Sequence, residues 1–141
     1  MYFIHANVMA VLSVINGIIG DRVSARGRGL AAIFYAGIFI SGITNVALFL
    51  SSSFGTVLAT RLSHALGDSL TLVTRSLIVS NIFASKRMGG NLGAVTTTIT
   101  VATLLGAVIS GAVPGYVNGF IIVGILAVIV IPLAMAVKPE F

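Results

Sequence analysis

Residues 17–29 read GIIGDRVSARGRG and interrupt a sequence that is otherwise almost free of charge. Four charged side chains gather in this run: Asp21, Arg22, Arg26 and Arg28. Long apolar stretches lie on both sides of it, and a helix that crosses a bilayer needs about 20 mostly apolar residues. The run therefore predicts a charged connection between two membrane-spanning helices.

The composition of the whole chain agrees with this reading. Of the 141 residues, 57% are hydrophobic and 8% are charged, whereas a soluble domain carries about 25% charged residues. The net charge of +5 could indicate a nucleic-acid partner in a soluble protein, but no polar domain is present to hold one. Cysteine is absent, which excludes disulfides and thiolate metal sites. The sequence indicates an integral membrane protein embedded in the lipid bilayer, without nucleic-acid binding.

Five segments are long and apolar enough to span the membrane. They cover roughly residues 2–19, 30–51, 56–83, 91–112 and 117–137. The first lacks the basic start and cleavage site of a signal peptide, so we expect it to be a retained helix. The breaks between segments are short and rich in glycine, serine, proline or charge. We therefore expect an all-α integral membrane protein, with residues 1–141 forming a single transmembrane domain of five helices in an antiparallel bundle.

Basic residues are distributed unevenly over the connections, which predicts the orientation. Lysine and arginine are enriched in cytoplasmic loops of membrane proteins. Here they fall in the first and third connections and in the tail, as Arg22, Arg26, Arg28, Lys86, Arg87 and Lys138. These positions share one side of a five-helix meander. We expect a multi-pass protein of the cell membrane with its N-terminus outside and its C-terminus in the cytoplasm.

The third segment contains four ionisable residues, and a charge at the bilayer centre costs at least about 2.5 kcal/mol. At about 100° per residue they fall in one narrow stripe of a helix, with Asp68 about 10 Å along the axis from each arginine. The four are Arg61, His64, Asp68 and Arg75. One interpretation is that the arginines extend to the two membrane surfaces and Asp68 is satisfied between helices. The other is that the stripe lines a water-filled translocation path in which Asp68 exchanges protons.

Other features of the spans predict packing rather than chemistry. Small residues allow helices to approach closely in lipid, and we expect this role for Gly37, Gly42, Gly106, Ser110, Gly111, Gly115 and Gly119. Pro132 falls inside the fifth segment, where it removes a backbone hydrogen bond and favours a kink. His5 is expected at the outer membrane interface.

The opening run resembles a signature of the major facilitator superfamily, G-x-x-x-D-R-x-G-R-[RK]-x-[RK]. This signature joins the second and third helices of each six-helix half of these transporters. The matching positions are Gly17, Asp21, Arg22, Arg26 and Arg28. Ser24 replaces the usual glycine, and Ala25 stands where the family often has an arginine of its cytoplasmic charge network. The resemblance implies that the run is a cytoplasmic gating motif in which Arg26 or Arg22 substitutes for that arginine.

Weaker resemblances extend over the rest of the chain. The stretch RLSHALGDS at 61–69 is similar to the R-x-x-q-G-x-G pattern of the family's fourth helix. Arg61 and Gly67 match it, whereas His64 replaces the usual glutamine and Ala65 a usual glycine. ASKRMGGNLGA at 84–94 resembles the basic loop that follows that helix. LLGAVISGAV at 104–113 resembles the fifth helix of drug antiporters, but Ala107 replaces the expected proline, which does not support an antiporter subtype.

If the resemblance holds, the five helices correspond to the second to sixth of one half, with the N-terminal half favoured. Members of the family have two such halves, with the substrate site between them at mid-membrane. The chain would then be a fragment of a transporter that needs the missing remainder. The leading hypothesis is a partial secondary transporter that moves a small-molecule substrate by alternating access, with proton coupling through Asp68.

Two other classes of function compete with it. A small self-assembling exporter or channel subunit would form a homo-oligomer and line its pore with Arg61, Asp68 and Arg75, but it leaves the spacing from Gly17 to Arg28 unexplained. A membrane enzyme is disfavoured, because the two histidines lie on different helices without a metal-binding motif. No nucleophile or dinucleotide signature occurs either. We therefore predict no catalytic residues, no metal site and no cofactor.

Overall fold

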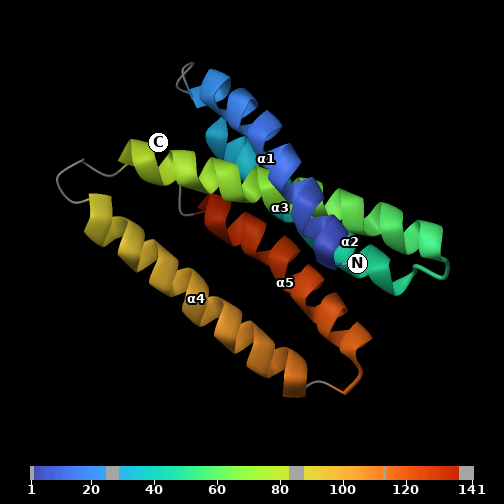
Figure 1. The fold of residues 1–141 in the computed structure, drawn as a ribbon. Coiled ribbons are helices and arrows are strands. Elements are labelled where there is room, and N and C mark those ends of the chain that lie inside the picture. Colours follow the sequence, from blue (N-terminus) through green and yellow to red (C-terminus); the bar gives the residue numbers. More distant parts are fainter. Residues whose placement is uncertain (1, 25–28, 83–87, 113, 137–141) are drawn as a thin grey trace.

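A computed structural model describes residues 2–24, 29–82, 88–112 and 114–136, and the secondary structure of these residues is helical (Figure 1). The helices are α1 (Tyr2–Ser24), α2 (Leu30–Phe49), α3 (Phe54–Ile82), α4 (Met88–Ala112) and α5 (Tyr116–Ala136). Each overlaps one of the five segments predicted from hydropathy. The expectation of an all-helical chain is confirmed.

Helix α1 ends later than predicted, so part of the charged run at 17–29 is helical. The sequence predicts an end near residue 19, but α1 continues through Ser24, so Asp21 and Arg22 lie on its last turns rather than in a connection. Contacts with α3 account for the extension. A Cβ on Gly20 would meet Leu77 at 2.6 Å, and the Asn81 side chain donates a hydrogen bond of 2.9 Å to Ser24 Oγ. Arg26 and Arg28 lie outside the described residues.

A side-chain cap marks the start of α3, and a left-handed glycine precedes α5. The backbone N–H of Thr56 donates to Ser53 Oγ at 3.2 Å and the backbone N–H of Ser53 donates to Thr56 Oγ1 at 3.1 Å, a reciprocal cap that begins α3 two residues before the predicted start. Gly115 precedes α5 with a φ of 79°, a left-handed conformation that favours glycine.

The interior of the described structure is polar and its exterior is apolar. Buried side chains include Asn16, Thr44, Asn45, Ser69 and Thr74, whereas large apolar side chains are exposed along the helices. This distribution is the reverse of a soluble protein and fits lipid as the surrounding medium. Three described helical stretches are long and apolar enough to cross a membrane, namely Phe3–Ser24, Leu30–Phe49 and Gly89–Ile109. The charged helix α3 is not among them.

Helix α2 lies at the centre of the arrangement. It packs against α3 on one side and α5 on the other, while α1 packs mainly on α3 and α4 lies beside α5 (Figure 1). Consecutive helices run in opposite directions (Figure 1), but α1 barely touches α2. The alternating direction agrees with the predicted antiparallel arrangement, and the packing adds that α3 lies between α1 and α2.

Glycines allow the close approach of α2 to its two neighbours. A Cβ on Gly67 would lie 2.8 Å from the carbonyl oxygen of Gly37, and a Cβ on Gly124 would lie 2.6 Å from that of Gly42. The packing role predicted for Gly37 and Gly42 is confirmed. It is not seen for Gly106 and Gly111 of α4, where an added Cβ would have no described neighbour within 4 Å.

Candidate functional site

Asp68 lies where α1, α2 and α3 meet and gathers polar groups from all three helices. Its Oδ2 is 3.4 Å from Nε2 of His5 on α1 and 3.4 Å from Nε2 of His64, one turn earlier on α3. The Ser41 hydroxyl on α2 donates a hydrogen bond of 2.7 Å to the other carboxylate oxygen, Oδ1. The Asp68 side chain stays 33% exposed, so one side of the cluster is open.

The two histidines are in contact with each other and are largely buried. Their ring centroids are 5.3 Å apart, with 30° between the ring planes. Each side chain is 16% exposed. Nδ1 of His64 is 3.3 Å from the Thr44 hydroxyl on α2. Nδ1 of His5 is buried and has no hydrogen-bond partner among the described residues. We refer to His5, Ser41, Thr44, His64 and Asp68 as the histidine–aspartate cluster.

The positions of the cluster residues follow from the packing of the helices. Because Gly37 and Gly67 let α2 and α3 approach, Ser41, one turn after Gly37, comes within reach of Asp68, which directly follows Gly67. The register of α1 on α3 is held by a buried hydrogen bond of 2.6 Å from Asn16 Nδ2 to Ser69 Oγ. Hydrogen bonds between helices are favoured in lipid because no water competes for them.

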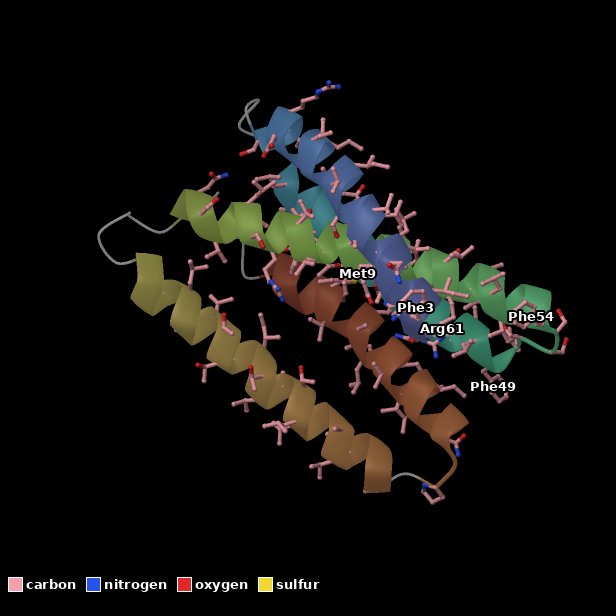
Figure 2. All side chains as sticks on the ribbon, viewed as in Figure 1. Phe3, Met9, Phe49, Phe54 and Arg61 are labelled. Carbon is pink, nitrogen blue, oxygen red and sulfur yellow. The ribbon has the colours of Figure 1, made fainter. Side chains whose placement is uncertain are left out.

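Two of the four residues of the predicted stripe on α3 belong to the cluster. His64 and Asp68 are at its centre. Arg61 is partly buried one turn before His64, toward the Phe54 end of α3 (Figure 2). Arg75 is partly buried two turns beyond Asp68. The translocation path of Arg61, His64, Asp68 and Arg75 stays a prediction.

The predicted gating residues lie far along α1 from the cluster. Asp21 and Arg22 are exposed on the last turns of the helix. An added Cβ at Gly17 would find no described atom within 4 Å, so the chain itself gives no packing reason for glycine there. The glycine of this region that packs tightly is Gly20.

Three members of the cluster were not expected from the sequence. His5 lies against Asp68, while its expected place at the outer interface stays a prediction, and Ser41 and Thr44 belong to a helix that is otherwise mostly apolar. A polar residue in an apolar span is the signal that could have found them, since such groups need partners inside the protein. Which partner they take depends on helix packing.

The structure defines a multi-pass helical membrane protein with an ionisable site between its helices. The family profile of the Major Facilitator Superfamily matches residues 1–140, and the chain belongs to this superfamily of membrane transporters. It is therefore a transporter-family protein and not an enzyme, and the resemblance seen in the sequence is confirmed.

One curated relative is a transporter. The riboflavin transporter RibZ of Clostridioides difficile (strain 630) is 29% identical to the chain over 118 residues, which cover 79% of this chain and 25% of that protein. The chain thus spans about a quarter of the length of this relative. No solved structure matches the chain.

Proposed function

We propose that this chain is part of a secondary transporter that moves a small solute by alternating access, with the movement coupled to protons at the histidine–aspartate cluster. The observation that carries the proposal is the pairing of Asp68 with His5 and His64 between helices whose exterior is apolar. Membership of the superfamily supports the transport class.

The cluster suits proton coupling because its contacts join three helices. His5 comes from α1, Ser41 from α2, and His64 and Asp68 from α3. Adding or removing a proton changes the charge between these partly buried side chains, where a charge interacts more strongly than it does in water. A protonation event can therefore bias how the helices pack, which is what alternation between two conformations requires.

The other sequence predictions complete the proposal. The exposed Asp21 and Arg22 at the end of α1, together with Gly17, Arg26 and Arg28, would form a cytoplasmic gate. The N-terminus would then lie outside and the C-terminus inside. The substrate site would lie between this chain and the remainder of the transporter, as in two-halved carriers.

The named relative supplies a first substrate to test. RibZ is named for riboflavin, and we propose a small aromatic solute of that kind as the substrate class. The polar cluster and its open side are compatible with a solute that carries hydrogen-bonding groups.

The test is proton-driven uptake of riboflavin by the complete transporter that contains this chain. Asp68→Asn should abolish accumulation driven by a proton gradient while leaving exchange of solute across the membrane. Ser63→Asn is the matched control, because it places the same side chain on the exposed face of α3. Unchanged accumulation by Asp68→Asn would remove the cluster from coupling.

Crosslinking in native membranes distinguishes a self-assembling exporter or channel subunit from a part of a larger carrier. A discrete homo-oligomer of the chain alone that transports solute after reconstitution would support an exporter or channel subunit. Transport that requires the remainder of the carrier supports the proposal.

A further inference from the structure

We propose that Asn45 on α2 is a solute-binding residue, and that its side-chain amide recognises a planar edge of the solute on which a hydrogen-bond donor stands next to an acceptor. Binding of a solute rests on the proposed function, and Asn45 defines the chemistry of that solute more closely. This role follows from the burial, the unmet hydrogen bonds and the position of the side chain.

Asn45 differs from the other buried polar side chains. Five such side chains occur among the described residues: Asn16, Thr44, Asn45, Ser69 and Thr74. Four of them form hydrogen bonds, either to another helix or to a carbonyl oxygen of their own helix. Asn45 is 9% exposed, yet its amide has no hydrogen-bond partner among the described residues. Because a buried polar group without a partner is costly, a partner from outside the described chain is expected.

The amide of Asn45 does not bond to its own helix either. On α1, the exposed Asn7 donates to the carbonyl oxygen of Phe3, four residues earlier, at 2.7 Å. The equivalent carbonyl oxygen for Asn45 is that of Ser41, which accepts the Thr44 hydroxyl at 3.1 Å instead. Both the NH₂ group and the carbonyl oxygen of the Asn45 amide are therefore uncommitted within the described chain.

The position of Asn45 on α2 directs it between two helices. Ser41, one turn earlier, faces α3 and donates to Asp68 Oδ1 at 2.7 Å. Gly42 faces α5, where its carbonyl oxygen would lie 2.6 Å from a Cβ added to Gly124. At about 100° per residue, Asn45 falls about 40° from Ser41 and Gly42 about 100° from it, in the same direction. Asn45 is therefore directed between α3 and α5, the two helices that flank α2 (Figure 1).

The surroundings of Asn45 suit a small molecule rather than another helix. The chain itself already covers about nine-tenths of the residue, whereas a helix from the remainder of the carrier would need an exposed face to pack on. The amide is not sealed, because the fully buried side-chain atom without a partner in the described chain is Nδ1 of His5. The residual exposure of Asn45 thus includes its amide, which a narrow group of a small solute can reach.

An uncommitted amide defines the chemistry of the group that it binds. Its NH₂ donates and its carbonyl oxygen accepts in one plane, so it pairs with an edge that offers an acceptor next to a donor, as asparagine pairs with adenine in DNA. The ring system of riboflavin carries such an edge, an N–H flanked by two carbonyl oxygens. A solute held at Asn45 would lie about 6 Å along α2 from Ser41, and hence near the Asp68 carboxylate to which Ser41 donates.

The test is riboflavin binding to the complete transporter that contains this chain, purified in lipid nanodiscs. Two probes are titrated and followed by their fluorescence: riboflavin, and riboflavin methylated on the ring nitrogen between the two carbonyl groups, which cannot donate to Asn45. For the wild type we expect a Kd about tenfold higher for the methylated probe, because the Asn45 carbonyl oxygen would be left without its donor.

Variants at position 45 separate recognition from packing. Asn45→Leu keeps the approximate size of the side chain and removes the amide. It should raise the Kd for riboflavin about tenfold and leave that for the methylated probe nearly unchanged, so that the discrimination is lost. Asn45→Ala should lose the discrimination too, and it serves where leucine disturbs the fold. A loosened structure would instead raise both Kd values together.

Asn7→Leu is the matched control, because Asn7 is exposed and bonds to its own helix. Both of its Kd values should equal those of the wild type. A wild type that binds the two probes equally, or variants at position 45 that keep the full discrimination, would overturn the inference and leave the proposed function standing. A carrier that binds neither probe would refute the proposed substrate class and this inference with it. Loss of discrimination in a carrier whose uptake ignores the proton gradient would refute the proton coupling alone.

Discussion

Gly37 and Gly67 face each other so closely that a Cβ added to Gly67 would lie 2.8 Å from the carbonyl oxygen of Gly37 and 2.5 Å from Ser41 Oγ. The same hydroxyl donates to Asp68 Oδ1. The close crossing of α2 and α3 therefore also holds Ser41 within hydrogen-bonding distance of Asp68. A change that separates the helices also removes a donor from the carboxylate.

Gly67→Ala should destabilise the chain for this reason. Two of the three nearest atoms to the new methyl group are backbone atoms, which cannot turn away, and overpacking of this kind costs about 1–3 kcal/mol. We expect a lower midpoint of thermal unfolding in detergent micelles, measured by circular dichroism.

Gly17→Ala is the matched control. It is the same change in a helix, but no described atom lies within 4 Å of the added Cβ, and alanine favours the helix by about 1 kcal/mol. Its unfolding midpoint should stay the same or rise. Equal losses in the two variants would show that the close approach of α2 and α3 does not limit stability.

The sequence allowed the five helices and the stripe on α3 to be predicted, because hydropathy and a helical period are local properties. His64 and Asp68 share a face through their spacing alone. His5 could not be assigned to them, since its contact depends on the register of α1 on α3, which Asn16 and Ser69 hold.

Which small residues lie at helix contacts could not be predicted either, because this also depends on how the helices pack. The small residues of α2 and α4 look alike in the sequence, yet those of α2 make close contacts, whereas a Cβ added at Gly106 or Gly111 of α4 meets no described atom within 4 Å. Only the partner helix distinguishes a packing glycine from a glycine that faces outward.

The hydrogen bond from Asn16 to Ser69 should contribute measurably to the pairing of α1 with α3. Both residues are buried, at 7% and 0% exposure, and the bond is 2.6 Å long. Hydrogen bonds between membrane helices average about 0.6 kcal/mol and reach about 1.7 kcal/mol. A double-mutant cycle with Asn16→Ala and Ser69→Ala, followed by unfolding in micelles, should give a coupling energy in this range.

The control cycle combines Asn16→Ala with Ser76→Ala. Ser76 is exposed on α3 and bonds to its own helix through Leu72 O, so its coupling to Asn16 should be zero within error. A zero coupling for Ser69 as well would mean that apolar packing alone holds α1 in register.

Asp21→Asn should impair transport by the complete carrier without unfolding it. Asp21 is exposed and forms no ion pair with another described residue, so its loss should leave the unfolding midpoint unchanged. As part of a cytoplasmic gate it would act on the remainder of the transporter, and uptake should fall severalfold. Asp21→Glu, which keeps the charge, should restore part of the rate. Full activity of Asp21→Asn would remove this residue from the gate.

The orientation can be tested directly because the chain contains no cysteine. Ser52 lies between α2 and α3, and its side chain is exposed. With the N-terminus outside, Ser52→Cys should react with a membrane-impermeant maleimide in intact cells. Lys86→Cys, in the basic stretch between α3 and α4, should react only after permeabilisation, because cytoplasmic loops retain lysine and arginine.

The two variants control each other, because permeabilisation makes both sites accessible to the reagent. After permeabilisation both should label equally, which shows that each thiol is reachable. Labelling of Lys86→Cys in intact cells, with Ser52→Cys protected, would reverse the orientation. It would also place the Asp21 end of α1 outside, where a cytoplasmic gate could not form.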